Sequence, residues 1–223
     1  FPIVMRHGLT IGEAMRLINE REGIGCKLKI IRMNGWDRKM FFDETGQPWI
    51  MPSPNIPTAD TALLYPGMVL LEGANLSEGR GTTRPFELAG APWIEPDKLA
   101  RRLSAAMLEG VLFRPVHFEP AWDKHMGNIC GGVQIHVTRR KTFQPVRCAV
   151  TILDAAASLY PDEFSWLEPP YEYELDRLPI DVIAGGPEIR ETIDTGSGTR
   201  ALFEKWKAEE QGFKRGRRPF LLY

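Results

Sequence analysis

The stretch IVMRHGLTIGEAMRLINEREGIGCKLKIIRM, residues 3–33, decides the expected fold of the first part of the chain. It opens on an apolar run, after which Thr10 and Glu13 have the spacing of a capping box, where each side chain bonds the other's backbone amide at a helix start. Apolar residues then recur at helical spacing until two glycines interrupt them. Residues 26–33 alternate as a strand does. The stretch therefore predicts strand, helix and strand, the unit that builds parallel α/β sheets.

The remainder of the chain predicts a second, differently built region. Residues 34–57 indicate an aromatic-rich loop, and Thr58 is positioned to cap a short helix that ends at Pro66. The continuous apolar run MVLLE, 68–72, is typical of a buried parallel strand. A domain boundary is expected near residue 95. Beyond it the pattern predicts further elements at about 97–109 (helix), 111–118 and 132–138 (strands), from Pro145 (helix), and near 187–194 and 199–210 (short helices).

Composition excludes several classes of function. The 223 residues are 43% hydrophobic and 26% charged, as in ordinary globular proteins. A net charge of −1 argues against binding nucleic acid or an anionic membrane surface through long-range attraction. No run of 18 apolar residues exists, so no transmembrane segment is expected. The opening FPIV has neither a methionine nor a polar lead-in, which favours a piece of a longer polypeptide.

Arg6-His7-Gly8 resembles the signature of histidine phosphatases, in which a strand delivers a nucleophilic histidine. Such an enzyme also needs a partner histidine, and the other three histidines do not stand before a glycine. A phosphatase that uses His7 is therefore the weaker alternative. The segment HFEPAWDKH, 117–125, holds histidines and carboxylates that could bind a metal ion, but Pro120 leaves their geometry undefined. We predict no metal site and no cofactor.

The most informative stretch is EGANLSEGRGTTRPFE, 72–87. A predicted strand ending in Glu72 would place this carboxylate at the carboxyl edge of the sheet, where open α/β sheets bind ligands. The glycines that follow allow backbone amides to form an anion-binding nest. Asn75, Arg80 and Thr82 add hydrogen-bond donors, and Arg80 can hold a carboxylate with two bonds. The alternative is a tight turn whose polar groups cap one another.

Three segments resemble the bacterial exo-acting β-N-acetylmuramidases of the NamZ type, glycoside hydrolases that trim peptidoglycan. They are RHGLTIGE, MNGWDRKMFFDETGQPWIMPSPNIPT and LYPGMVLLEGANLSEGRGTTRPFELAGAPWI. The resemblance implies a fold of the α/β and α+β classes: the C-terminal portion of a Rossmann-like catalytic domain over residues 1–95, and a smaller α+β auxiliary domain over residues 96–223. Family members carry additional chain ahead of this part, with much of the Rossmann-like domain and a catalytic glutamate.

The resemblance also implies a function: release of N-acetylmuramic acid from the non-reducing end of peptidoglycan fragments. Glu72 would be the catalytic acid/base partner or a hydroxyl-binding anchor, and Arg80 with the 79–82 amides would hold the lactyl carboxylate of the sugar. The remaining candidate substrate-binding residues are Asn75, Thr82, Trp36, Asn55 and His7. The expected partners are a peptidoglycan-derived saccharide and the absent N-terminal segment, and the expected location is extracytoplasmic. A non-catalytic carbohydrate-binding fragment is the main alternative.

Overall fold

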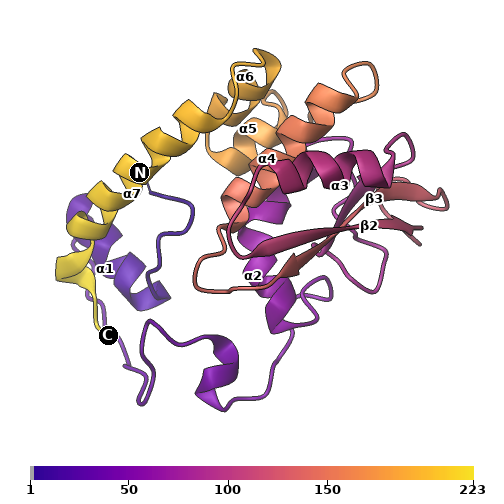
Figure 1. The fold of residues 1–223 in the computed structure, drawn as a ribbon. Helices are drawn as coiled ribbons and strands as arrows, with labels where there is room; N and C mark the ends of the chain where they lie inside the picture. The colour runs from indigo at the N-terminus through magenta and orange to yellow at the C-terminus, as the bar shows by residue number, and fades with distance from the viewer. Residues whose placement is uncertain (1–2) are drawn as a thin grey trace. The chain divides into compact units, whose positions relative to one another are not determined.

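The computed structural model describes residues 3–223 and divides the chain into two compact units (Figure 1). The N-terminal unit combines Phe1–Ile50 with Phe203–Tyr223 from the other end of the sequence. The central unit is Met51–Leu202. The expected boundary at residue 95 falls inside the central unit, and the division into two domains there stays a prediction.

Helices and irregular chain make up the N-terminal unit. Its elements are α1 (Ile11–Arg21), the 3-10 helix η1 (Phe42–Thr45), most of α7 (Arg200–Gly216) and the 3-10 helix η3 (Arg218–Phe220), which packs on α1. The predicted capping box is confirmed: the Glu13 amide donates to Thr10 Oγ1 at 3.4 Å, and the Thr10 amide donates to Glu13 Oε2 at 2.8 Å. Local chemistry alone therefore sets where α1 begins.

The strands predicted on either side of α1 are wrong, because residues 3–10 and 24–33 form turns and irregular chain. A strand needs a neighbour that takes its backbone hydrogen bonds. Here side chains take some of them: Asn19 bonds both the amide and the carbonyl of Cys26, and the Met33 amide donates to the Tyr223 hydroxyl at 2.8 Å. An alternating pattern without a pairing partner does not make a strand.

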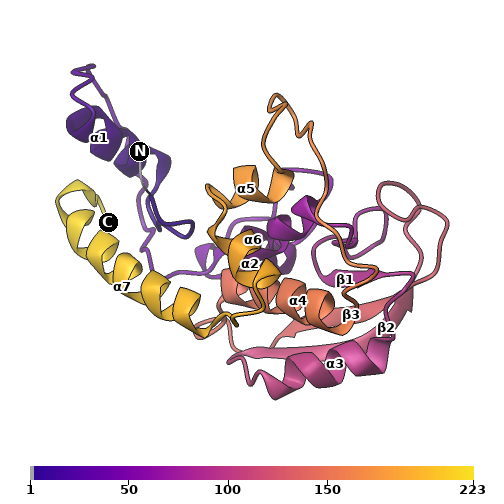
Figure 2. The same cartoon turned by 90° about the horizontal axis from the view of Figure 1, so that it is seen from above.

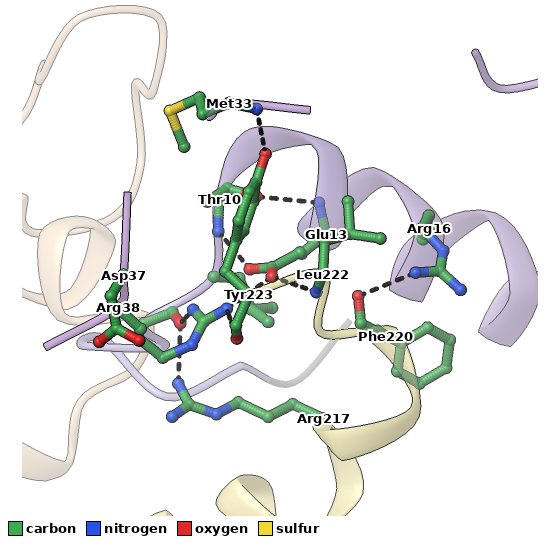
Figure 3. A network of polar contacts seen from close by, with 12 residues as sticks. Thr10, Glu13, Arg16, Met33, Asp37, Arg38, Arg217, Phe220, Leu222 and Tyr223 are labelled. Atoms are coloured by element: carbon green, nitrogen blue, oxygen red, sulfur yellow. Dashed lines mark hydrogen bonds and ion pairs between the residues drawn. The ribbon is translucent and has the colours of Figure 1, made fainter. Parts of the chain in front are cut away.

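Glu13 is completely buried in this unit. It lies at the centre of a network of polar contacts (Figure 3). Its carboxylate accepts the Leu222 amide at 2.6 Å and pairs with the Arg38 guanidinium, which also reaches the Tyr223 carbonyl oxygen at 3.3 Å. Burial, the largest influence, acts to raise the pKa of Glu13, but the bonds from Leu222, Thr10 and Arg38 outweigh it and hold that pKa below its ordinary value. Residues from both ends of the sequence thus meet at one carboxylate.

The central unit is built around a three-stranded antiparallel sheet in the order β1-β3-β2. Its strands are β1 (Leu88–Ala91), β2 (Val111–Phe118) and β3 (Cys130–Val137), with Val111 opposite Val137 and Phe118 opposite Cys130. The predictions for β2 and β3 are confirmed. Helix α3 (Pro96–Ala105) packs on β2 and β3, as Figure 2 shows. The mixed helix-and-sheet class is confirmed, but the sheet is antiparallel and not the parallel sheet that residues 3–72 predicted.

The strand predicted over 68–72 is also wrong. Helix α2 (Ala59–Met68) runs through Pro66 and continues directly into the 3-10 helix η2 (Val69–Gly73). A short, wholly buried apolar run does not distinguish a strand from a buried helix by its periodicity. Gly67 does not end α2 as predicted: it allows close packing on α4 (Pro145–Leu159), since a Cβ there would lie 1.9 Å from the Pro145 carbonyl oxygen.

The core of the central unit lies between α2, η2, α3 and α4, with Leu70, Leu71, Leu99, Ile152 and Leu153 fully buried. Two short helices, α5 (Pro179–Ala184) and α6 (Glu188–Asp194), complete the unit; α5 packs on η2 and α6 on α4. Across residues 3–223, no helix combines the length and the apolar character needed to cross a membrane. The polar segment that leaves η2 is therefore anchored at its start by a well-packed helical core.

Candidate functional site

Glu72 and Arg80 come together, as the glycine-rich stretch predicted, but at the end of a 3-10 helix and not at a strand end. The Arg80 guanidinium pairs with Glu72 Oε1, and the Tyr171 hydroxyl donates to Glu72 Oε2 at 3.0 Å. The Glu72 side chain is only 10% exposed. Both of its oxygens therefore have a donor from this chain.

Burial raises the pKa of Glu72 above its ordinary value, against the opposing charge of Arg80 and the hydrogen bond from Tyr171. Burial and the adjoining Glu72 carboxylate also raise the pKa of the Tyr171 hydroxyl, so Tyr171 keeps its proton and remains a donor. A carboxyl group whose pKa is shifted toward neutrality can both give and take a proton. This arrangement is capable of acid–base chemistry.

A second layer of charge surrounds this pair. Arg80 also faces Glu78 and Asp123, each at 3.6 Å, and its guanidinium carbon lies 5.2 Å from the centre of the Phe86 ring. Lys124 contacts Glu78 at 2.7 Å. Arg80 is therefore held by the protein's own carboxylates, and we infer that it orients Glu72. That it binds a carboxylate of the substrate stays a prediction.

Asn75 and Thr82 hold the loop together. The Asn75 amide group donates to the Glu163 carbonyl oxygen at 2.7 Å and accepts the Ser165 amide at 3.1 Å. Thr82 Oγ1 donates to the Gly79 carbonyl oxygen at 2.6 Å and accepts the Arg84 amide at 3.0 Å. These side chains fit the alternative given above, a tight turn whose polar groups cap one another. The Thr82 backbone amide, which was expected to belong to an anion-binding nest, also donates a hydrogen bond within this turn.

The name cluster is used here for Glu72, Glu78, Arg80, Asp123, Lys124 and Tyr171. The other predicted residues are described within their own units. Asn55 precedes α2 and is half-buried, with its amide donating to Ser53 Oγ at 3.3 Å. In the N-terminal unit, the Trp36 ring packs edge-on against Tyr223 at 5.0 Å. His7 follows no strand, and its Nδ1 accepts the Leu9 amide at 3.1 Å. The strand-borne nucleophile of the phosphatase alternative is thus absent from the described chain.

The sequence did not indicate Tyr171, Lys124 or Glu78 as members of this cluster. Tyr171 is 99 residues from Glu72 along the chain and reaches it from a tight turn closed by reciprocal 2.9 Å backbone bonds with Glu174. The sequence of segment 117–125 indicated only a possible metal site. In the structure, Asp123 faces Arg80 and His125 Nε2 bonds the Asn75 carbonyl oxygen at 2.7 Å, and no metal-binding cluster forms among residues 3–223.

Gly81 sets the distance between the glycine-rich loop and the β2–β3 loop. Its φ is +76°, and a Cβ would lie 2.4 Å from the Trp122 carbonyl oxygen. We expect Gly81→Ala to destabilise the central unit by about 2 kcal/mol or more, from backbone strain plus displacement of Trp122. Urea unfolding measures the loss. Gly127→Ala is the matched control, because Gly127 has φ +72° but open space around it; equal losses in both variants would contradict the close approach.

Comparisons with known proteins agree over the whole chain. The family model described as "Exo-beta-N-acetylmuramidase NamZ, C-terminal" matches residues 63–223, and the corresponding N-terminal model matches residues 1–60. The chain is 39% identical over 223 residues to the peptidoglycan beta-N-acetylmuramidase NamZ of Bacillus subtilis (strain 168). It covers 52% of that protein, so it spans about half the relative's length.

Two solved structures have similar folds. A DUF1343 family protein from Bacteroides fragilis NCTC 9343 matches 96% of this chain with a TM-score of 0.85 and 29% identity. A second DUF1343 protein from the same organism matches 97% with a TM-score of 0.68 and 22% identity, a likeness that concerns the fold alone. The chain covers 56% of each of these structures.

Proposed function

Because this chain belongs to the family of exo-β-N-acetylmuramidases of the NamZ type, we propose that it forms part of a glycoside hydrolase that releases N-acetylmuramic acid from the non-reducing end of peptidoglycan fragments. The observation that carries the proposal is Glu72: a nearly buried carboxyl group with a raised pKa, held by Arg80 and Tyr171. Cleavage of a glycosidic bond needs carboxyl groups that transfer protons or stabilise positive charge at the sugar. Glu72 would be one of them, as acid/base partner or as an anchor for a sugar hydroxyl.

We further propose that the activity needs more of the family's N-terminal domain than this chain contains. The N-terminal unit leaves large apolar side chains in water: Ile11 is 85% exposed and Ile31 is 86% exposed, whereas Leu17 is the one fully buried apolar residue of α1. Exposed apolar surface of this kind favours burial against further chain. Since the substrate is cell-wall material, the expected location of the protein is extracytoplasmic, either periplasmic or secreted.

The test is release of free N-acetylmuramic acid from a disaccharide of N-acetylmuramic acid and N-acetylglucosamine. One arm uses this chain alone; the other adds the part of the B. subtilis relative that the chain does not span. We expect release in the second arm. Saccharide binding without release in both arms would support the non-catalytic carbohydrate-binding alternative, and neither binding nor release would remove both proposals.

A further inference from the structure

The loop between β2 and β3 contacts the segment that carries Glu72 and holds it in place. Three consecutive residues contact it: Asp123 faces Arg80, Lys124 enters the cluster, and His125 bonds the Asn75 carbonyl oxygen at 2.7 Å. Asp123 and His125 have φ of +69° and +60°, a conformation that non-glycine residues seldom adopt. Such backbone is retained where surrounding contacts enforce it. The conformation of residues 123–125 is therefore fixed by their contacts with the segment that carries Glu72.

Lys124 lies at the centre of residues 123–125. Its side chain is 17% exposed, and its ammonium group donates to the Leu71 carbonyl oxygen at 2.8 Å and to the Ala74 carbonyl oxygen at 3.1 Å. The same group contacts Glu78 at 2.7 Å. The ammonium group therefore makes two hydrogen bonds to backbone carbonyl oxygens and one ion pair with Glu78. Two of these bonds fix the backbone immediately before and shortly after Glu72.

The ion pair between Lys124 and Glu78 decides how Arg80 is shared. Glu78 is 1% exposed, and a buried carboxylate must be paired with a cation. Lys124 is the close partner of Glu78, while Arg80 lies farther from it at 3.6 Å. Without Lys124, Arg80 would be drawn toward Glu78, away from Glu72. Lys124 thus pairs with Glu78, and Arg80 pairs with Glu72.

We propose that Lys124 is a positioning residue for Glu72: it neutralises Glu78, fixes the backbone on both sides of Glu72, and so leaves Arg80 to Glu72. The proposal rests on the proposed function for its relevance to catalysis, but not for its structural content. It assigns the β2–β3 loop a role in setting the protonation of the candidate carboxyl group, at a distance of more than fifty positions along the chain.

The charged and titratable groups that face Glu72 come from three elements. Arg80 and Glu78 follow it in the glycine-rich loop, Lys124 belongs to the β2–β3 loop, and Tyr171 to the 171–174 turn. Glu78 acts to raise the pKa of Glu72, and Lys124 acts to lower it. Helix α5 also packs on η2, but its Asp181 is paired with Arg190 at 2.9 Å. Changes at Glu78 and Lys124 should therefore move the Glu72 titration in opposite directions.

The decisive experiment follows the Glu72 carboxyl carbon by NMR titration in the full chain, with Glu72→Gln to assign the signal. Lys124→Met should raise the pKa of Glu72, Glu78→Gln should lower it, and the double variant should return it close to the wild-type value. Lys141→Met, at an exposed lysine, is the matched control and should leave it unchanged. If Lys124→Met does not fold, Glu78→Gln and the double variant decide. An unchanged Glu72 titration in Glu78→Gln, or a double variant displaced from wild type, would overturn the proposal.

Saccharide release in the complemented chain supplies the second readout. Lys124→Met should lower kcat/KM by about 100-fold, because a small misplacement of a catalytic group has effects of this size. The double variant should recover part of this loss and restore the pH profile. If wild type itself releases no sugar while the titrations shift as expected, the proposed function fails and the positioning role stands.

Discussion

Glu72→Gln is expected to reduce release of N-acetylmuramic acid by about 1000-fold, the range associated with removal of a general acid or base. Glutamine keeps the shape of the side chain and can still accept the Tyr171 hydrogen bond, but it cannot exchange a proton. The fold should survive, since Arg80 retains Glu78 and Asp123 as partners. Release is measured from the muramic acid–glucosamine disaccharide in the complemented chain.

Glu109→Gln is the matched control, because Glu109 is exposed on the central unit away from this cluster. Saccharide binding is measured in parallel. Unchanged binding with lost release would assign Glu72 to the chemical step, whereas lost binding would assign it to a sugar hydroxyl. Full activity in Glu72→Gln would exclude Glu72 from both roles.

Glu13→Ala is expected to unfold the N-terminal unit locally, at a loss of about 3–5 kcal/mol, the usual result when one partner of a buried ion pair is removed. The variant leaves Arg38 without its carboxylate and the Leu222 and Thr10 amides without their acceptor. Amide hydrogen exchange would rise in α1 and in residues 217–223. The amides of α4 serve as an internal reference and should keep their protection.

Glu20→Ala is the matched control on the same helix, because Glu20 is exposed. The same carboxylate also predicts acid sensitivity. The pKa of Glu13 is lowered in the folded state, so its contribution is present at neutral pH and is lost as the pH falls below about 4. NMR signals of α1 should therefore weaken in acid before those of α4. Equal protection in Glu13→Ala and wild type would contradict this role for the carboxylate.

Local signals in the sequence predicted well those elements that depend on local chemistry. The Thr10–Glu13 capping box locates the start of α1, Pro145 locates the start of α4, and β2 occupies the range its pattern indicated. The failures concern elements whose form depends on distant partners. Residues 26–33 have strand periodicity, but their backbone bonds go to Asn19 and Tyr223. MVLLE is buried among helices, and burial alone does not specify a strand.

The same distinction applies to the candidate site: contacts between residues close in sequence could be predicted, and contacts between distant residues could not. Glu72 lies at the end of η2, and Arg80 follows it by eight residues in the glycine-rich loop, so the sequence itself places them near each other. Tyr171 and Lys124 lie in turns that are distant from Glu72 in the sequence. Neither of their surrounding segments, PPYEYE and WDKHMG, has a pattern that indicates a contact with Glu72. Arg80 illustrates a further limit: its residue type indicates a carboxylate partner, but not whether that partner is a substrate or the protein itself.

The discontinuous make-up of the N-terminal unit has a consequence for the order of events during synthesis. Residues 51–202 are contiguous, so the central unit can fold as soon as it has left the ribosome. The N-terminal unit cannot, because Glu13 waits for Leu222 and Arg38 waits for Tyr223. Residues 3–50, with their exposed isoleucines, therefore cannot complete these contacts before residues 222 and 223 are available. A chain truncated after residue 202 should therefore keep a protease-resistant central unit, whereas its residues 3–50 should be protease-sensitive.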